Sequence, residues 1–242
     1  MSRWFKKPTV EFICRIEGVQ ETMPIIPAKD LKHPWVLRAL NDLAGRRKAV
    51  NGVFFEKTAH ISKCPGIFSL MRHGWVLRSW LDISIETYGD GISCAWTTPI
   101  NQRNSLGVDA VEIRSKQELT QFLGAWDGAT DGTIKLNTPW DCVVPDGYML
   151  LEMPVQYGDD ARFEVLSGFV LPEYGPTSLS PQIKWKVASG KTLIKAGTPL
   201  AQYIPIKKEK IDMMMTTSLV DRNKKVRDIL LTSTFANATK QL

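Results

Sequence analysis

The side chains that could hold a metal ion in this chain of 242 residues are few and scattered. The three histidines are His33, His60 and His73. None stands in an H-x-H, H-x-x-H or H-E-x-x-H spacing, which would bring two imidazoles to one ion. His33 precedes a proline and His73 precedes a glycine, and both contexts are typical of turns. We therefore predict no metal and no other cofactor.

Patterns for a nucleophile or a phosphate-binding loop are weak as well. Cys64 has a histidine nearby on either side, but a cysteine before a proline at a helix start is more typical of packing. The run S-G-K-T at 189–192 ends like a phosphate-binding loop without the upstream glycine that such a loop needs. It lies between Val187 and Leu193 and indicates a hairpin turn.

Two groups of carboxylates remain to be considered. Asp159 and Asp160 follow Tyr157-Gly158, a turn composition, so we expect a solvated loop there. The second group is Glu164 with Glu173, and Glu173 lies in the string L-P-E-Y-G-P.

Short strands must position these residues. From 138 to 208 the chain consists of runs rich in β-branched and aromatic residues, each closed by proline or glycine, which predicts strands joined by tight turns. Apolar and polar residues also alternate over 9–17 and 81–87, and the string Y-G-D-G at 88–91 predicts a hairpin to a returning strand. The fold class we predict is mainly β, a sandwich or barrel with most of the eight tryptophans in its core.

Helices are expected at fewer places. We predict short ones over 34–44, 64–71 and 115–123, the last opened by a capping box of Ser115 and Glu118. A basic amphipathic helix is predicted over 218–235.

Changes in composition divide the chain into three parts. We predict an N-terminal α+β part at 1–124, a strand-rich part at 133–210 and a helical extension at 211–242. The sequence leaves open whether the first two form one continuous domain.

The C-terminal segment carries most of the excess basic charge. The net charge is +6, and residues 207–242 hold eight Lys/Arg against four Asp/Glu, which is +4 of that total. The side chains that we expect to contact a partner are Lys224, Lys225, Arg227, Ile229 and Leu230.

The cysteines and the N-terminus bear on the compartment. The four cysteines are dozens of residues apart with no C-x-x-C, so we expect reduced, buried thiols. No apolar stretch follows the basic N-terminus, and no run reaches the roughly 18 apolar residues of a membrane helix. We therefore expect no signal peptide, no transmembrane segment and no membrane partner.

Three strings resemble the second half of dUTPases in order and spacing. They are P-D-G-Y at 145–148, S-G-F-V-L-P-E-Y at 167–174 and I-K-A-G-T-P-L-A-Q at 194–202. The resemblance implies a β-clip-like fold for the part at 133–210. It also implies a pocket, for which the candidate residues are Glu173, Tyr174, Gly197 and Gln202.

The catalytic groups of that family do not carry over. Leu171 stands where the family has the aspartate that activates water, and a leucine neither holds nor deprotonates water. Gly175-Pro176 replaces the family's Arg-Gly, and E-M-P at 152–154 replaces its serine-rich phosphate motif. The resemblance thus implies the fold without dUTP hydrolysis by this route.

The chain is also similar, over more of its length, to a family of β-rich proteins from tailed phages and some bacteria that has no assigned activity. The matching strings are K-C-P at 63–65, G-W-V-L at 74–77, T-P-W…P-D-G-Y at 138–148, L-S-G-F-V at 166–170 and K-A-G-T-P with the I-P-I strand at 195–206. This resemblance implies a viral origin.

We therefore expect a non-enzymatic structural or interaction protein, a head, neck or tail accessory subunit of a phage particle. Its partners would be other virion proteins or copies of itself, in the virion or in the host cytoplasm during infection. The alternative is a nucleotide-binding or nucleotide-hydrolysing enzyme of a degenerate dUTPase-like type, with Glu173, Asp159 or Asp160 as its base. The basic C-terminal segment leaves nucleic acid open as a partner, and protein partners are favoured.

Overall fold

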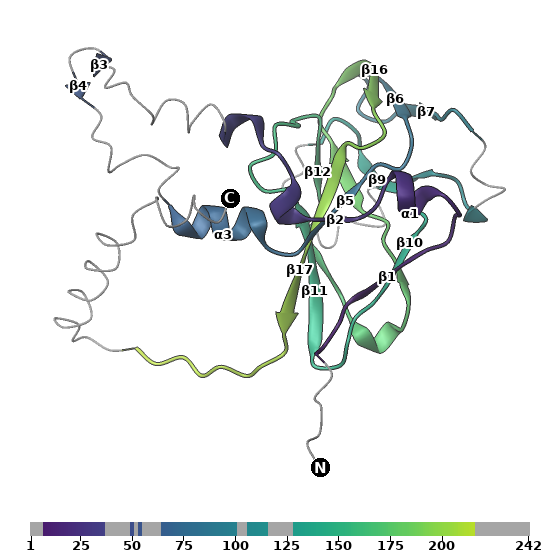
Figure 1. Cartoon of the computed structure of the whole chain (residues 1–242). Helices are drawn as coiled ribbons and strands as arrows, with labels where there is room; N and C mark the ends of the chain where they lie inside the picture. The colour runs from purple at the N-terminus through teal and green to yellow at the C-terminus, as the bar shows by residue number, and fades with distance from the viewer. Residues whose placement is uncertain are drawn as a thin grey trace. The chain divides into compact units, whose positions relative to one another are not determined.

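The computed structural model describes residues 7–36, 49–50, 53–54, 64–100, 106–115 and 128–215. They form five antiparallel sheets and a few short helices (Figure 1), so the predicted mainly β class is confirmed. The chain divides into two compact units, residues 1–31 with 73–208, and residues 32–72 with 209–242.

The sheet with most strands has the order β13-β11-β17-β5-β2. Its strands are β2 (Ile26–Pro27), β5 (Trp75–Arg78), β11 (Tyr148–Pro154), β13 (Gly168–Val170) and β17 (Pro199–Lys207). β11 and β17 lie side by side in Figure 1 and pair over the whole length of β11. Leu150, Ala201 and Tyr203 are fully buried on one face of this pair, which is the face that meets the core.

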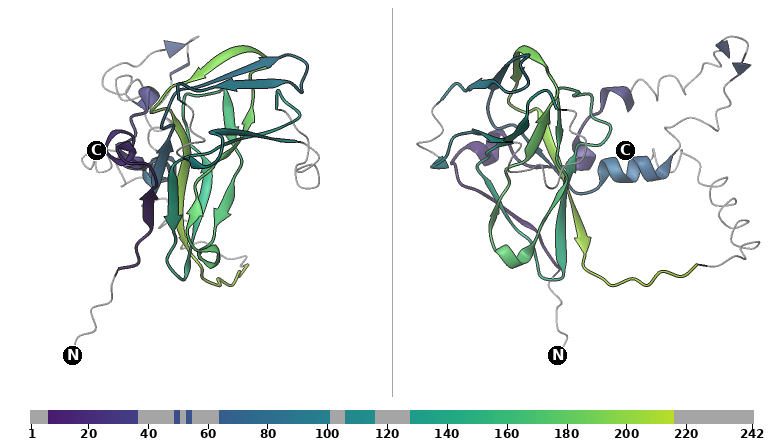
Figure 2. Two further views of the ribbon diagram at one scale, coloured as in Figure 1. Left: turned by 90° about the vertical axis from the view of Figure 1, so that its right-hand side faces the viewer. Right: turned by 180° about the vertical axis from the view of Figure 1, so that it is seen from behind.

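A three-stranded sheet, β1-β10-β14, also packs against the hydrophobic core. Its strands are β1 (Glu11–Cys14), β10 (Trp140–Val143) and β14 (Thr177–Ser178). β1, drawn in purple in Figure 2, is an edge strand and is shorter than the predicted range. Its alternation is as predicted, because Phe12 packs inward and Ile13 is exposed. Phe12 meets Trp75 of β5 edge to face, with ring centroids 5.3 Å apart.

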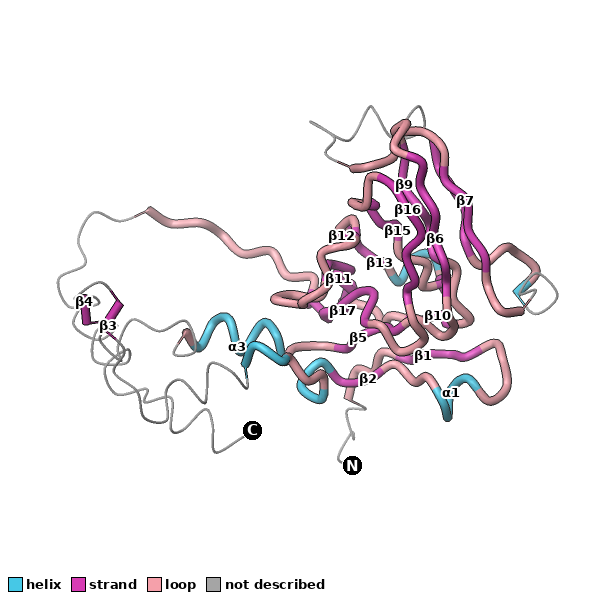
Figure 3. The backbone as a smooth tube through the Cα atoms, turned by 90° about the horizontal axis from the view of Figure 1, so that it is seen from above, coloured by secondary structure: helices cyan, strands magenta, loops and turns pink. Residues whose placement is uncertain are grey.

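Two further sheets complete this unit. One has the order β12-β15-β9-β8, with β8 (Val111–Ser115), β9 (Gly132–Leu136), β12 (Phe163–Val165) and β15 (Gln182–Trp185). The other has the order β16-β6-β7, with β6 (Ile83–Tyr88), β7 (Cys94–Thr97) and β16 (Ser189–Ile194), and these three run side by side in Figure 3.

The predicted hairpin over 88–91 is confirmed, because β6 pairs with β7. Gly89 and Gly91 supply the positive φ angles of this turn, and the Asp90 carboxylate accepts hydrogen bonds from the backbone N–H groups of Ile92 and Ser93. The turn predicted for 189–192 is wrong. These residues belong to β16, where Gly190 pairs with Thr87 and Lys191 with Glu86 of β6.

Strands from both sides of the sequence boundary at 124–133 share sheets. β1 pairs with β10, β5 with β17, β6 with β16, and β8 with β9. Because backbone hydrogen bonds cross that boundary in four sheets, the strands of the two parts depend on one another.

The helices are short. They are α1 (Val19–Thr22), the 3-10 turns η1 (Ala28–Asp30) and η4 (Pro172–Tyr174), and α3 (Pro65–Arg72). α3 confirms the helix predicted from residue 64, and in the same unit a two-stranded ribbon joins β3 (Ala49–Val50) and β4 (Val53–Phe54). In the described chain no helix is long and apolar enough to cross a bilayer.

Several predicted features fall wholly or partly outside the described residues. Of the helix predicted over 34–44, only residues 34–36 are described, and they are helical. The helix after Ser115, the helix over 218–235 and the five proposed partner-contact residues, Lys224, Lys225, Arg227, Ile229 and Leu230, lie outside the described ranges.

The predictions that most tryptophans lie in the core and that the cysteines are buried are confirmed in part. Trp140 and Trp185 are buried at 3% and 0% exposure. All four cysteines are free; Cys142 is buried as expected, Cys14 and Cys94 are partly buried, and Cys64 is exposed. The expectation of buried thiols was therefore wrong for Cys64, which lies just before the first turn of α3.

Candidate functional site

An acidic side chain lies on the core face of the β11–β17 pair. Glu152 is directly opposite Tyr203 across the two strands, so both side chains project to the same face. The Tyr203 hydroxyl donates a hydrogen bond to Oε2 of Glu152. Tyr203 is fully buried, whereas Glu152 is partly buried. The third member of this cluster is Cys142 of β10, which is also fully buried and lies close enough to influence both groups.

The surroundings of these groups shift all three pKa values upward. Burial raises the pKa of the Glu152 carboxyl, and the hydrogen bond from Tyr203 opposes that shift. Burial, with the nearby charges of Asp141 and Glu152, raises the pKa of the Cys142 thiol to about 12. Burial and the charge of Glu152 raise the pKa of Tyr203.

These shifts decide what the cluster can do chemically. A thiol with a pKa near 12 stays protonated and is a poor nucleophile, since the thiolate is the reactive form. The pKa of Glu152 moves upward from that of an ordinary carboxyl, so this side chain holds a proton more readily than an exposed glutamate does. The described residues contain no group of three or more metal-ligating side chains. The cluster therefore offers one proton-exchanging or cation-attracting carboxyl.

The residues proposed from the dUTPase resemblance lie at separate places. Glu173 and Tyr174 belong to η4, which is tied to the end of β17 by the ion pair between Glu173 and Lys208. Gly197 lies in the turn before β17, where its N–H donates to Ser79 O at 2.7 Å. At ~3.3 Å per residue, the nine residues of β17 put roughly 30 Å between these two places.

Gln202, the fourth of these residues, is at 1% exposure in the middle of β17. Its Nε2 donates to His73 O at 2.9 Å, and its Oε1 accepts from Gln156 N at 3.4 Å. The amide thus joins β17 to two backbone segments.

Glu173, Asp160 and Glu164 each pair with a basic side chain. The hydrogen bond from Lys208 lowers the pKa of Glu173. For Asp160, burial raises the pKa, but the hydrogen bonds and charge of Arg162 outweigh it and the net shift is downward. Glu164 pairs with Lys186 at 2.6 Å. A lowered pKa makes a carboxylate a weaker base, so neither Glu173 nor Asp160 is tuned for proton abstraction.

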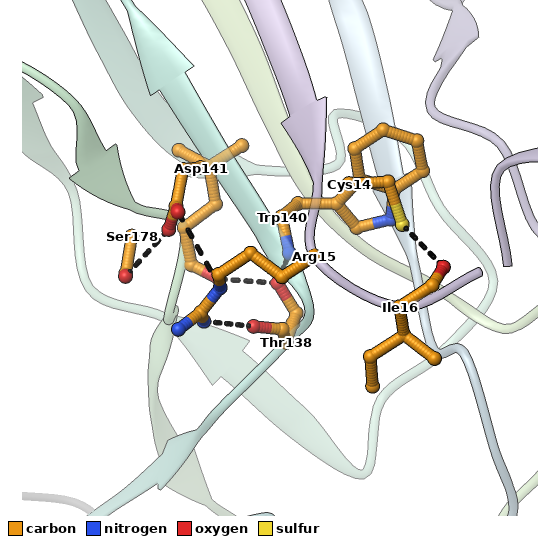
Figure 4. A network of polar contacts seen from close by, with 8 residues as sticks. Cys14, Arg15, Ile16, Thr138, Trp140, Asp141 and Ser178 are labelled. Atoms are coloured by element: carbon orange, nitrogen blue, oxygen red, sulfur yellow. Dashed lines mark hydrogen bonds and ion pairs between the residues drawn. The ribbon is translucent and has the colours of Figure 1, made fainter. Parts of the chain in front are cut away.

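A separate polar network fastens the N-terminal strand (Figure 4). The Arg15 guanidinium reaches toward β10, where Nη2 donates to Thr138 O at 2.9 Å and Nε lies 3.4 Å from Asp141 Oδ2. Ser178 of β14 donates to Asp141 Oδ1 at 2.6 Å. The network therefore links all three strands of the sheet β1-β10-β14, and its members are occupied with one another.

A run of exposed apolar side chains follows β17. Residues 208–215 have neither helix nor strand structure, and we call them the exposed segment. Its apolar members are 81–86% exposed: Ile211, Met213, Met214 and Met215. Methionine side chains are flexible and polarizable, which suits them to contact with surfaces of varied shape.

Sequence analysis did not predict a role for Glu152, because its string E-M-P was compared only with the serine-rich phosphate motif that it replaces. One signal was available: in M-L-L-E-M the glutamate is two residues after Leu150, so in a strand both point to the same face. The partnership with Tyr203, 51 residues later, had no signal in the sequence.

Comparison with solved structures finds phage dUTPases. A mutant dUTPase from phage phi11 of S. aureus is 11% identical over 87% of this chain and 97% of that chain, with a TM-score of 0.37. The dUTPase of Staphylococcus bacteriophage 80alpha is also 11% identical, over 87% of this chain and 97% of that chain, with a TM-score of 0.36. The three strings of the sequence also resembled dUTPases. Sequence identity and TM-scores as low as these carry no argument about activity.

No protein-family model matches the sequence, and no curated protein matches it. The resemblance to β-rich proteins of tailed phages and bacteria therefore stays a prediction.

Proposed function

We propose that this chain is a non-enzymatic interaction protein that binds other protein subunits, and that it serves as an accessory component of a phage particle. The observation that carries the first part is the exposed segment, in which four apolar side chains are 81–86% exposed. Contiguous apolar exposure of this kind is typical of surfaces that contact another protein. The second part rests on the sequence resemblance to phage proteins.

The polar groups of the first unit also favour a scaffold over a catalyst. Asp141, Glu173 and Asp160 each pair with a basic side chain, which fixes their geometry. Such pairing suits a rigid domain with a structural role.

The test is quantitative mass spectrometry of density-purified particles from the source. We expect peptides of this chain at many copies per particle, in a constant ratio to a known capsid protein. Peptides found in infected cells but absent from purified particles would overturn the virion assignment.

The alternative, a nucleotide-hydrolysing enzyme, has one specific observation in its favour. Glu152 is a partly buried carboxyl with a raised pKa, which is the direction that suits a general base. Incubation of the full chain with dUTP or dCTP and Mg²⁺ decides this reading. Pyrophosphate release that disappears in Glu152→Gln would establish it in place of the interaction role, and no release with any common nucleotide would eliminate it.

A further inference from the structure

Glu152 differs from other partly buried carboxylates of this protein in its surroundings. Asp141, Glu112 and Asp160 each have an arginine or lysine within ion-pair distance. Glu152 accepts the Tyr203 hydroxyl through Oε2, and among the described residues Oε1 has no hydrogen-bond partner and no cation lies in ion-pair distance. A carboxylate held partly out of water without a cation costs free energy and makes the space around it electronegative.

The strand beside Glu152 leaves room next to it. Gly168 of β13 is directly opposite Glu152, so a side chain at 168 would project to the same face, about 5 Å away. A Cβ added at Gly168 would meet no atom within 4 Å, and its φ is outside the left-handed region. Neither packing nor backbone conformation requires a glycine here.

β13 is also the edge strand of its sheet, so nothing in that sheet lies beyond Gly168. Gly168 itself is exposed. The edge of the sheet beside Glu152 is therefore open at Gly168.

We propose that Glu152 and the open space over Gly168 bind a small organic cation that carries N–H donors, an alkylammonium or guanidinium group. The cation supplies the charge that the carboxylate lacks, and its N–H groups donate to Oε1. The Tyr203 hydroxyl holds the carboxylate through the other oxygen and so fixes the direction of Oε1. The site does not involve the exposed segment, so it is independent of the proposed function.

The titratable groups that face Glu152 give this site a defined pH dependence. They are Tyr203 from β17 and Cys142 from β10, whose raised pKa values keep both neutral. Binding should therefore strengthen as pH rises through the pKa of Glu152, because only the carboxylate attracts a cation.

The test titrates the full chain with butylammonium and, separately, with methylguanidinium, and follows backbone amide signals by NMR. We expect saturable shifts at Gly168 and Glu152. In Glu152→Gln the affinity should fall about tenfold or more, because a charge-assisted hydrogen bond is lost. Butanol, a neutral probe of similar shape to butylammonium, should produce no saturable shift at these positions.

Two further variants test the site independently of Glu152→Gln. Gly168→Val fills the open space with a β-branched side chain that suits a strand, and it should weaken binding without loss of fold. Glu164→Gln, which removes a carboxylate paired with Lys186, should bind as the unmodified chain does. Equal shifts with butanol, unchanged affinity in Gly168→Val, or no shift at Gly168 in the unmodified chain would overturn the proposal.

Discussion

The sheet β12-β15-β9-β8 and the pair β11–β17 both carry glutamates, and the two sets of surroundings are opposite. On the first sheet Glu112 of β8 receives a hydrogen bond from Asn137 Nδ2 at 2.6 Å and lies 2.9 Å from Arg114 and 3.7 Å from Lys135. On the second, Glu152 has the neutral hydroxyl of Tyr203.

The difference moves the two pKa values in opposite directions. The hydrogen bond from Asn137, with the charges of Lys135 and Arg114, lowers the pKa of Glu112, whereas burial raises that of Glu152. Ionised Glu112 is thus favoured in the folded chain, and ionised Glu152 is disfavoured. The hydrogen bond and ion pairs of Glu112 stabilise its sheet, whereas burial of Glu152 lowers the stability of the folded chain at the position where we propose that a cation binds.

The largest effect on stability should come from a substitution at Gly74, which lies against the backbone of β17. Gly74 has a φ of +75°, and a Cβ there would lie 1.9 Å from Tyr203 O. Gly74→Ala should lower the free energy of unfolding by ~3 kcal/mol or more, because both the backbone and the packing at Tyr203 must shift. Urea denaturation measures this change.

Gly147→Ala is the matched control, since Gly147 has a φ of +78° and open space around its Cβ position. It should cost ~1 kcal/mol, which is the conformational penalty alone. If both variants lose the same free energy of unfolding, the close approach of residue 74 to Tyr203 O does not contribute to the effect.

The next effect tests the raised pKa at β11. Glu152→Gln keeps an oxygen that can accept the Tyr203 hydroxyl and removes the charge, so it should raise the free energy of unfolding near neutral pH by ~1 kcal/mol. For the unmodified chain, a carboxyl with a raised pKa makes stability fall as pH rises from the unfolded value of 4.5 through the folded pKa. The gain in Glu152→Gln should therefore shrink in acid, and a variant that is less stable at neutral pH would contradict this assignment.

The opposite sign is expected at Glu112. Glu112→Gln should lower the free energy of unfolding near neutral pH by ~0.5 kcal/mol, a value reduced because the side chain is 28% exposed. A carboxyl with a lowered pKa stabilises above its unfolded value of 4.5 and loses that contribution as pH falls through the folded pKa. The same urea series in acid should thus show no difference from the unmodified chain, and a stabilising substitution at neutral pH would show that the two glutamates do not differ as described.

The smallest effect on stability should come from the exposed segment. Serine at Met213, Met214 and Met215 together should change the free energy of unfolding by less than ~0.5 kcal/mol, because these side chains are 81–86% exposed. Incorporation into particles should fall all the same, as measured by mass spectrometry of virus grown with the variant. If the variant enters particles as often as the unmodified chain does, the exposed segment does not mediate the proposed binding.

Local patterns in the sequence determined several elements of this protein. The alternation in β6 with the glycine-containing turn after it, and the helix after Cys64, were predictable because hydrogen bonds or side-chain periods that define them span only a few neighbouring residues. The mainly β class followed from the density of such runs.

Tertiary pairing decided the rest. The string S-G-K-T has the composition of a turn, yet it is a strand because β6, about 100 residues earlier, offers a partner for its backbone groups. Glu152, Tyr203 and Gly168 meet only through the order β13-β11-β17, in which Tyr203 lies 51 residues after Glu152. Residue types and short spacings carry no record of such an order, because it depends on which distant faces and edges bury and pair together best.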